Sequence, residues 1–381
     1  MVTNMPENDR KPSLRFKGFN DAWEQCEAGG LVSITTGKSN TQDQKEDGIY
    51  PFFIRSETPV KSNKYLYDEE AVITIGDGQI GKVFHYINGK FDLHQRCYKM
   101  SNFTNLSGKY FYYYFSTMFY DRAMKMTAKA TVDSVRLEMI SKMEIKYPKD
   151  LKEQNQISLL LSNVDSLITL HQRKYDKLVS VKKALLDKMF PETGNDVPKI
   201  RFKGFNDAWE QCEVGKIFKV TRGYVLPVSA TSPQKTENTP YPVYSSQTQN
   251  NGLMGYYKDY LFDTAITWTT DGANAGTVSF RGEKFYSTNV NGVLLSDKGY
   301  ANKCVAEALN LLAWKHVSHV GNPKLMNNVM SEIAIIIPPT ISEQESISQL
   351  LTKLDVIITL HQRKHEKLQN IKKALLSKMF A

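Results

Sequence analysis

The sequence predicts an α+β fold with two pseudo-symmetric domains, each a twisted β-sheet with packed helices, joined by two long antiparallel coiled-coil helices. One observation behind this prediction is a repeat: residues 15–27 read Arg-Phe-Lys-Gly-Phe-Asn-Asp-Ala-Trp-Glu-Gln-Cys-Glu and recur unchanged as 201–213. Another is a pair of related segments, 157–190 and 347–380, in which apolar residues recur at helical spacing. A period near half the chain length is far longer than a solenoid repeat and indicates two homologous halves.

The segments 150–190 and 341–380 are predicted to be long helices that share a coiled-coil seam, because steps of three and four are sustained over about five heptads. Each begins after a proline, has acidic residues in its first turn and ends in basic residues, as the helix dipole favours. About forty residues at about 1.5 Å each give a spacer of roughly 60 Å. The predicted seam residues are Ile157, Leu161, Val164, Ile168, His171, Tyr175, Leu178 and Leu185, then Ile347, Leu351, Leu354, Ile358, His361, His365, Leu368 and Leu375.

Two histidines, His171 and His361, fall in this seam. A polar seam residue commonly fixes the register of a coiled coil, and we favour that role over catalysis. His361 and His365 are one turn apart, but the first helix has Tyr175 at the second position. A ligand pair present in only one copy is better explained by packing than by a metal site.

The inserts between the repeated segments, roughly 38–140 and 224–330, have diverged almost beyond alignment. Both carry strand-like runs separated by Gly and Asp turns, at 50–54, 71–75 and 83–87 and at 241–244, 265–268 and 277–280. Propensity favours a strand for the aromatic run 110–115, but its positional counterpart, 304–314, has a helical composition. We therefore predict helices at both places, packed on the sheets.

These patterns divide the chain into six segments, with a polar Pro/Gly linker between the halves. The predicted segments are an N-terminal tail 1–13, a first domain 14–148, a first spacer helix 149–190, a linker 191–199, a second domain 200–338 and a second spacer helix 339–381.

The composition predicts a folded cytoplasmic protein with an acidic partner. Of 381 residues 41% are hydrophobic, which is enough for two cores, and no apolar run approaches the length of a membrane span. The first residues lack the basic and apolar regions of a signal peptide, and the four cysteines form no Cys-x-x-Cys pair, so we expect reduced thiols. Residues 171–190 carry six Lys/Arg against two Asp and 361–380 carry six against one Glu, which together match the net charge of +9. Such concentrated basic charge suits nucleic acid or an acidic protein surface, although a solvated helix face would have the same composition.

No motif in the sequence predicts a catalytic site. Gly76-Asp-Gly78-Gln-Ile-Gly81 has the spacing of a dinucleotide-binding fingerprint, but the residues that follow read as a strand and not as the helix that would hold a pyrophosphate. We therefore expect a tight hairpin turn there. The sequence also lacks the P-loop, the Gly-x-Ser-x-Gly elbow, the His-Glu-x-x-His pattern and the Asn/Asp-Pro-Pro-Tyr/Phe motif of amino-methyltransferases.

By contrast, the turns of both inserts carry side chains that suit DNA. Arg and Lys bond guanine edges, Asn and Gln bond adenine edges, and hydroxyls suit phosphates, although exposed loops often have this composition without binding anything. The candidates in the first insert are Thr36, Lys38, Asn40, Arg55, Ser56, Gln79, Lys82, Gln95, Arg96, Lys129, Thr131 and Arg136. Those in the second are Arg222, Tyr224, Ser245, Ser246, Gln247, Thr269, Thr270, Asn274, Asn291 and Lys324.

The chain resembles the specificity subunits of type I restriction-modification systems. The resemblance rests on the opening segments through Trp23-Glu24 and Trp209-Glu210, on the helix ends 182–190 and 372–380, and on the Pro148 and Pro338 approaches with the Gly-Asp-Gly turn. It covers nearly the whole chain after residue 13, in the same order.

This resemblance implies a non-catalytic reader whose two target-recognition domains each bind one half of a bipartite, asymmetric target in double-stranded DNA. The helices would then set the gap between the half-sites and dock two methyltransferase subunits and, through the complex, restriction subunits. No cofactor is expected on this chain: S-adenosylmethionine would belong to the methyltransferase subunits, and ATP and Mg to the restriction subunit.

Two other interpretations remain open at this point. One is a nucleotide-binding enzyme built around Gly76 to Gly81, which predicts nucleotide binding by the isolated chain. The other is a coiled-coil adaptor that contacts only protein, which gives no reason for the inserts to diverge while the flanking segments stay fixed.

Overall fold

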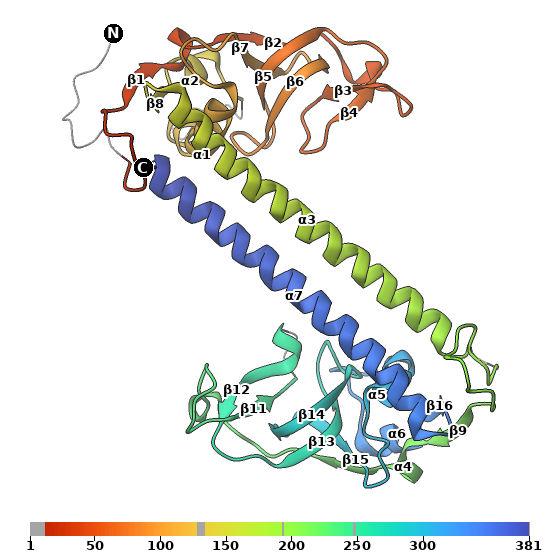
Figure 1. Ribbon diagram of the computed structural model, residues 1–381. Coiled ribbons are helices and arrows are strands. Elements are labelled where there is room, and N and C mark those ends of the chain that lie inside the picture. The colour runs from red at the N-terminus through yellow and green to blue at the C-terminus, as the bar shows by residue number, and fades with distance from the viewer. Residues whose placement is uncertain (1–11, 128–133, 193, 247–248, 381) are drawn as a thin grey trace. The chain divides into compact units, whose positions relative to one another are not determined.

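The computed structural model describes residues 12–127, 134–192, 194–246 and 249–380, and it divides into two compact units. Unit 1 comprises Met1–His171 with Arg363–Ala381, and unit 2 comprises Gln172–Gln362. Each unit contains one sheet domain and a segment of each of two long helices, α3 (Leu151–Met189) and α7 (Ile341–Phe380) (Figure 1). The predicted α+β fold with two sheet domains and long helices is confirmed.

Both units contain a six-stranded mixed sheet of the same topology. The order in unit 1 is β2-β7-β5-β6-β3-β4 and in unit 2 is β10-β15-β13-β14-β11-β12. Neighbouring strands are antiparallel, except that β3 runs parallel to β6 and β11 parallel to β14. The strands of unit 1 are β2 (Ser33–Thr36), β3 (Tyr50–Phe53), β4 (Val60–Ser62), β5 (Tyr67–Ile75), β6 (Phe84–Leu93) and β7 (Cys97–Ser101). Those of unit 2 are β10 (Lys219–Arg222), β11 (Tyr241–Tyr244), β12 (Leu253–Tyr257), β13 (Phe262–Thr269), β14 (Val278–Ser287) and β15 (Asn291–Leu295).

The repeated opening segment ends in a short strand in each unit, and this strand pairs with the strand that leads into the long helix. In unit 1, β1 (Glu24–Glu27) pairs with β8 (Glu144–Tyr147), and in unit 2, β9 (Glu210–Glu213) pairs with β16 (Ala334–Ile337). The other α-helices are α1 (Gly108–Thr127), α2 (Leu137–Ser141), α4 (Val214–Ile217), α5 (Lys303–Ala313) and α6 (Asn327–Glu332). Short 3-10 helices are η2 (Ala28–Gly30), η3 (Thr41–Asp43), η4 (Val228–Ala230), η5 (Gln249–Gly252) and η6 (Trp314–His316).

The aromatic run 110–115 is helical, as predicted, because two sides of α1 are buried at once. Phe111, Phe115 and Phe119 recur every four residues and stack in sequence, with ring centroids 5.3 Å and 4.5 Å apart, in the core beneath the sheet. Tyr110 packs instead on Phe380 at the end of α7, with centroids 5.5 Å apart. Burial on two sides outweighs the strand propensity of the aromatic residues.

The strand predictions are confirmed, but the strands of the central hairpins are longer than predicted. Asn-Gly is a dipeptide common in hairpin turns, yet β6 continues through Asn88-Gly89, because Glu69 and Glu70 of β5 pair with these residues and Gly89 adopts a φ of +136°. The Gly76 to Gly81 segment does connect two antiparallel strands, but as a loop of residues 76–83 and not as a tight turn. The loop runs directly into β6, so no helix N-terminus follows it as a pyrophosphate site requires.

Each long helix is fixed at its start by a buried bidentate ion pair from the opening segment. Arg15 Nε lies 2.7 Å from a carboxylate oxygen of Glu153, whose side chain is 1% exposed. Arg201 repeats the contact with Glu343 at 2.7 Å, again with a carboxylate that is 1% exposed. The next residue of α3, Gln154, is fully buried and donates to the carbonyl of Pro148 (2.7 Å). The duplicated segments therefore anchor the duplicated helices.

Within each unit the two long helices run antiparallel. In unit 1, Asp165 of α3 pairs with Lys372 of α7 at 2.6 Å, while Leu161 and Met379 share one core cluster. In unit 2, Lys182 pairs with Asp355, also at 2.6 Å. The same two residue types therefore make the same contact in both units.

The four cysteines, Cys26, Cys97, Cys212 and Cys304, are free thiols. None of the described helices combines the length and apolar composition that a membrane crossing requires.

Because Glu343 is almost completely buried, we predict that Arg201→Met lowers the free energy of unfolding by about 3 kcal/mol or more, since it leaves a buried carboxylate unpaired. Urea denaturation followed by circular dichroism measures this change. The double variant Arg201→Met with Glu343→Met is expected to recover most of the loss. A double variant as unstable as the single one would show that the unpaired charge is not the cause.

Candidate nucleic-acid interface

Backbone hydrogen bonds in unit 1 gather the strand ends where most of the predicted contact residues lie. The Lys38 amide donates to the Leu93 carbonyl (N···O 3.1 Å), and the Gly76 amide donates to the Arg96 carbonyl (2.7 Å). The Val135 amide donates in turn to the Gly76 carbonyl (2.7 Å). The residues after β2, after β5 and before β7 therefore form one surface.

Unit 2 repeats this framework with other residues. The Tyr224 amide donates to the Ser287 carbonyl (3.1 Å), and the Thr270 amide donates to the Val290 carbonyl (3.1 Å). The Leu325 amide donates to the Thr270 carbonyl (2.9 Å). The predicted contact residues Lys38 and Tyr224 thus lie at equivalent places, although the inserts scarcely align in sequence.

One glycine in each unit makes this framework possible. A Cβ atom on Gly37 would lie 2.1 Å from the Leu93 carbonyl oxygen, and one on Gly223 would lie 1.8 Å from that of Ser287. Any side chain would separate the two segments. The close approach at these two glycines therefore determines where Lys38 and Tyr224, the residues that follow them, lie on the surface.

Asp77 in unit 1 holds two predicted contact residues together. Its two carboxylate oxygens each accept a hydrogen bond, one from Arg55 and one from Arg96, both at 2.9 Å. Partial burial raises the pKa of Asp77, but these hydrogen bonds outweigh it and hold the pKa below the usual range of Asp. The two arginine side chains remain 43% and 60% exposed, so their other N–H groups are available to a ligand.

The other predicted residues of unit 1 are mostly exposed around this pair. Asn40 is half-buried and caps η3 together with Asp43, and the Ser56 hydroxyl donates to the Thr58 carbonyl, so both have local structural roles. Lys129 and Thr131 lie outside the described residues. The exposed ones are Thr36, Lys38, Gln79, Lys82, Gln95 and Arg136.

In unit 2 the predicted contact residues differ in solvent exposure. Arg222, Tyr224 and Lys324 are exposed, and Ser245, Ser246 and Asn274 are half-buried. Gln247 lies outside the described residues. Thr269, Thr270 and Asn291 are buried. The sequence places Thr269 and Asn291 in turns, but they are the last residue of β13 and the first residue of β15.

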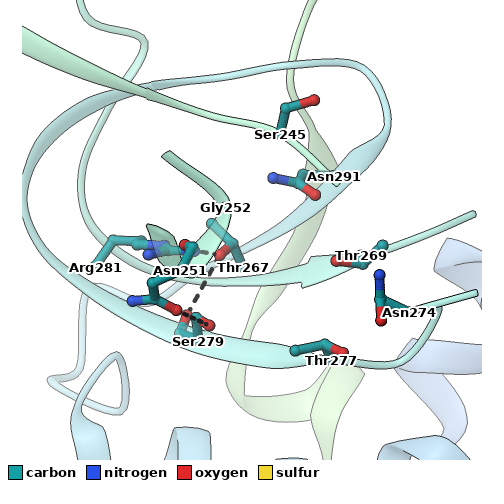
Figure 2. Close-up of a pocket in the computed structure, with 10 residues that line it drawn as sticks. All are labelled: Ser245, Asn251, Gly252, Thr267, Thr269, Asn274, Thr277, Ser279, Arg281 and Asn291. Carbon is teal, nitrogen blue, oxygen red and sulfur yellow. Dashed lines mark hydrogen bonds between the residues drawn. The ribbon is translucent and has the colours of Figure 1, made fainter. Parts of the chain in front are cut away.

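Two of these buried residues, Thr269 and Asn291, line a polar pocket of about 170 Å³ on the sheet of unit 2 (Figure 2). Four of the lining residues are candidate DNA contacts predicted from the sequence: Ser245, Thr269, Asn274 and Asn291. The others are Asn251, Gly252, Thr267, Thr277, Ser279 and Arg281. Of the described residues that line the pocket, Arg281 alone is charged.

Arg281 is 6% exposed and is held rigidly at one end of the pocket. Its guanidinium stacks on the Tyr244 ring, 3.7 Å from the centroid, and donates to the Thr267 hydroxyl (3.2 Å) and the Asn251 carbonyl (2.9 Å). Figure 2 shows Arg281, Asn251, Thr267 and Ser279 grouped together, with Thr269 and Asn274 apart from them.

The predicted seam residues face inward along both long helices. Ile157, Leu161, Val164, Ile347 and Leu351 are buried. The rest are half-buried: Ile168, His171, Tyr175, Leu178, Leu185, Leu354, Ile358, His361, His365, Leu368 and Leu375.

The seam also contains charged residues that the spacing of apolar residues does not predict. Lys182 takes the seam position after Leu178, and its ammonium pairs with Asp355 (2.6 Å) and Glu307 (3.2 Å). Lys303 of α5 pairs with the same two carboxylates. This network joins the domain of unit 2 to both helices.

Comparison with known proteins decides the family. The family model described as type I restriction modification DNA specificity domain matches residues 20–179 and 206–370. The chain belongs to this family. Each match covers part of one opening segment, one sheet domain and most of one long helix.

Relatives and a solved structure agree with this assignment. One type I specificity subunit of Mycoplasma pneumoniae is 30% identical over 223 residues, covering 58% of this chain and 78% of the relative. Another from the same organism is 36% identical over 151 residues, covering 39% of this chain and 61% of the relative, so the matched part is less than two thirds of that protein. The crystal structure of a type I S subunit from M. genitalium shares the fold, with a TM-score of 0.71 at 16% identity over 97% of this chain and 99% of that one.

The network around Asp355 gives this specificity-domain chain a defined response to acid. Burial raises the pKa of Asp355, but hydrogen bonds from Lys182 and Lys303 outweigh it and lower the pKa below its usual range. A depressed folded pKa contributes stability above the unfolded value of about 3.9, and this contribution is lost as the pH falls through the folded pKa.

We therefore predict that Asp355→Asn is less stable than wild type by a constant amount above about pH 5, and that the difference shrinks below about pH 4. Urea denaturation at a series of pH values measures it, with Asp187→Asn on the exposed face of α3 as the control. A difference that stays constant down to about pH 2 would contradict the assignment.

Proposed function

We propose that this chain is the DNA-recognition subunit of a type I restriction-modification complex and that each sheet domain reads one half of a bipartite, asymmetric target. The observation that carries this proposal is the shared backbone framework with unlike side chains on it. At equivalent places unit 1 offers Lys38, Arg55 and Arg96, whereas unit 2 offers Tyr224, Ser246 and Val290. Two readers with one scaffold and different surfaces suit a target with two unrelated halves.

The side chains at these places suit contacts with bases and phosphates. In unit 1 the carboxylate of Asp77 orients Arg55 and Arg96, and an oriented guanidinium can bond the O6 and N7 atoms of guanine. One good bidentate contact of this kind supplies about 1–3 kcal/mol of discrimination between bases. Exposed Lys and hydroxyl side chains at the same surface suit phosphates, which fix the register on the duplex.

The partners in this proposal are double-stranded DNA, two methyltransferase subunits and, through the complex, restriction subunits. The duplicated Arg–Glu anchors and the Asp–Lys pairs of the long helices support two docking places of the same kind. The chain itself would be non-catalytic. S-adenosylmethionine would bind to the methyltransferase subunits, and ATP with Mg to the restriction subunit.

The long helices would set the gap between the half-sites. They contain 39 and 40 residues, and each is uninterrupted from its proline approach to its basic end. A continuous helix of this length is about 60 Å long at about 1.5 Å per residue. If the two recognition domains are held apart by a rigid helix, the length of that helix determines how many base pairs separate the two half-sites.

Mapping methylated adenines tests the recognition role. We expect a bipartite motif in cells that carry the cognate methyltransferase subunits with this chain, and no such motif in cells that lack the chain. In a third strain, the insert 38–140 is exchanged for that of a relative, and one half-site is expected to change while the other stays. A methylation pattern independent of the chain would contradict the proposal, and a change in both half-sites would contradict its modular form.

Deleting one heptad from both helices together tests the spacer role. We predict that removing residues 169–175 and 359–365 shortens the gap by about three base pairs, since about 10 Å of helix corresponds to about three base pairs at about 3.4 Å each. The paired deletion keeps the seam register, whereas deleting only one segment should abolish methylation because the seam contacts no longer match. A paired deletion with the original gap would rule out the helices as the spacer.

A further inference from the structure

The described residues of unit 1 that are equivalent to the lining of the unit 2 pocket are apolar, although the two sheets have the same topology. Ala71 of β5 pairs with Ile87, whereas the equivalent Ala265 of β13 pairs with Arg281. The next positions along the same face of the sheet also change from apolar residues in unit 1 to polar residues in unit 2. Ile73, Ile75 and Cys97 are buried in the apolar cluster of unit 1, and their equivalents in unit 2 are Thr267, Thr269 and Asn291.

Arg281 is a buried cation whose guanidinium forms no ion pair with a carboxylate of the described residues. The negative charge of Glu283 acts on Arg281 only through space, because its carboxylate accepts a hydrogen bond from the Tyr244 hydroxyl (2.9 Å). Burial raises the pKa of Tyr244 to about 12, so this ring is uncharged at neutral pH. Burial also lowers the pKa of Arg281, as expected for a desolvated cation. An isolated buried charge is costly and is stabilised by an anion.

The rest of the pocket supplies hydrogen-bond donors and no acidic group. Its walls carry the hydroxyls of Thr269, Thr277 and Ser245 and the amides of Asn274 and Asn291. The Asn291 side chain is 2% exposed, and its amide oxygen has no hydrogen-bond partner among the described residues. The volume of about 170 Å³ far exceeds the roughly 10–15 Å³ that one water needs.

We propose that this pocket binds a phosphate group, with Arg281 as the cationic contact and the hydroxyl and amide groups as further donors. A guanidinium held in one orientation is the side chain best suited to bond two phosphate oxygens at once. If the chain reads DNA as proposed above, the phosphate is one of the DNA backbone, and the contact fixes the second domain on its half-site. Unit 1 has Ile87 at this place, so its domain lacks the contact.

The direct test is a titration of the full chain with inorganic phosphate against sodium chloride of equal ionic strength. Phosphate is expected to raise the unfolding temperature of the wild type and to broaden its ³¹P signal, because a ligand that binds only the folded state stabilises it. Arg281→Met should show neither effect. Lys284→Met, which removes an exposed cation from the same strand, should behave like the wild type.

Two features keep this test decisive. Met has a similar length and no charge, so Arg281→Met is expected to fold at least as well as the wild type without phosphate. If it does not fold, Asn274→Ala at the half-buried rim should bind phosphate at least threefold more weakly. Equal shifts in all variants, or no shift in the wild type, would overturn the proposal.

A second measurement identifies the source of the phosphate. The affinity of the full chain for a duplex is measured at several salt concentrations, and Arg281→Met should reduce the slope of log affinity against log salt by about 0.9, the value for one phosphate contact. An unchanged slope together with inorganic phosphate binding would overturn the backbone assignment and favour a free phosphate or nucleotide. A chain that binds phosphate but no duplex would contradict the proposed function and leave the pocket assignment intact.

Discussion

The bidentate contact between an arginine of the opening segment and a buried glutamate at the start of each long helix is the constraint on which both units depend. Arg15 with Glu153 and Arg201 with Glu343 have the same geometry, and in both the carboxylate is 1% exposed. A buried carboxylate without its partner is strongly destabilising, so the opening segment and the helix must keep this arrangement together. Because these anchors lie outside the inserts, the inserts can change without loss of the scaffold.

The alternation of side chains along a strand separates packing from recognition within each insert. One face of the unit 1 sheet, with Val72 and Met100, packs on α1, and the opposite face carries Ile73 and Ile75. In unit 2 the first face is likewise apolar, with Ile266 and Leu294 in the core, but the second carries the polar pocket around Arg281. A strand can therefore keep its core residues while its other face changes from apolar to polar.

The sequence was sufficient for elements with a strong period or a second copy. The long helices followed from the spacing of Ile157, Leu161 and their repeats, and α1 was predicted only because its counterpart 304–314 reads as a helix. The division of each half into repeated flanking segments and a diverged insert followed from the repeat itself. The lengths of β6 and β14 were not predictable, since Asn88-Gly89 carries a turn signal that strand pairing overrides.

The candidate site was predictable in position more than in detail. Lys38, Arg55 and Arg96 could be named from composition, but their common surface comes from long-range hydrogen bonds that no local pattern encodes. The burial of Arg281 was not predictable, because a charged residue just beyond the predicted strand 277–280 is expected to be solvent-exposed. Lys182 has the correct seam spacing, but the sequence predicts only that it belongs to a basic helix face, since its partial burial depends on Asp355 and Glu307 of distant segments.

Hydrogen–deuterium exchange of the full chain with and without its target duplex tests the central claim most directly. The account predicts protection of the gathered strand ends in both units, around residues 36–40, 54–56 and 76–82 in unit 1 and around 222–224 and 269–274 in unit 2. Protection confined to the basic helix faces 171–190 and 361–380, with the strand ends unchanged, would contradict it.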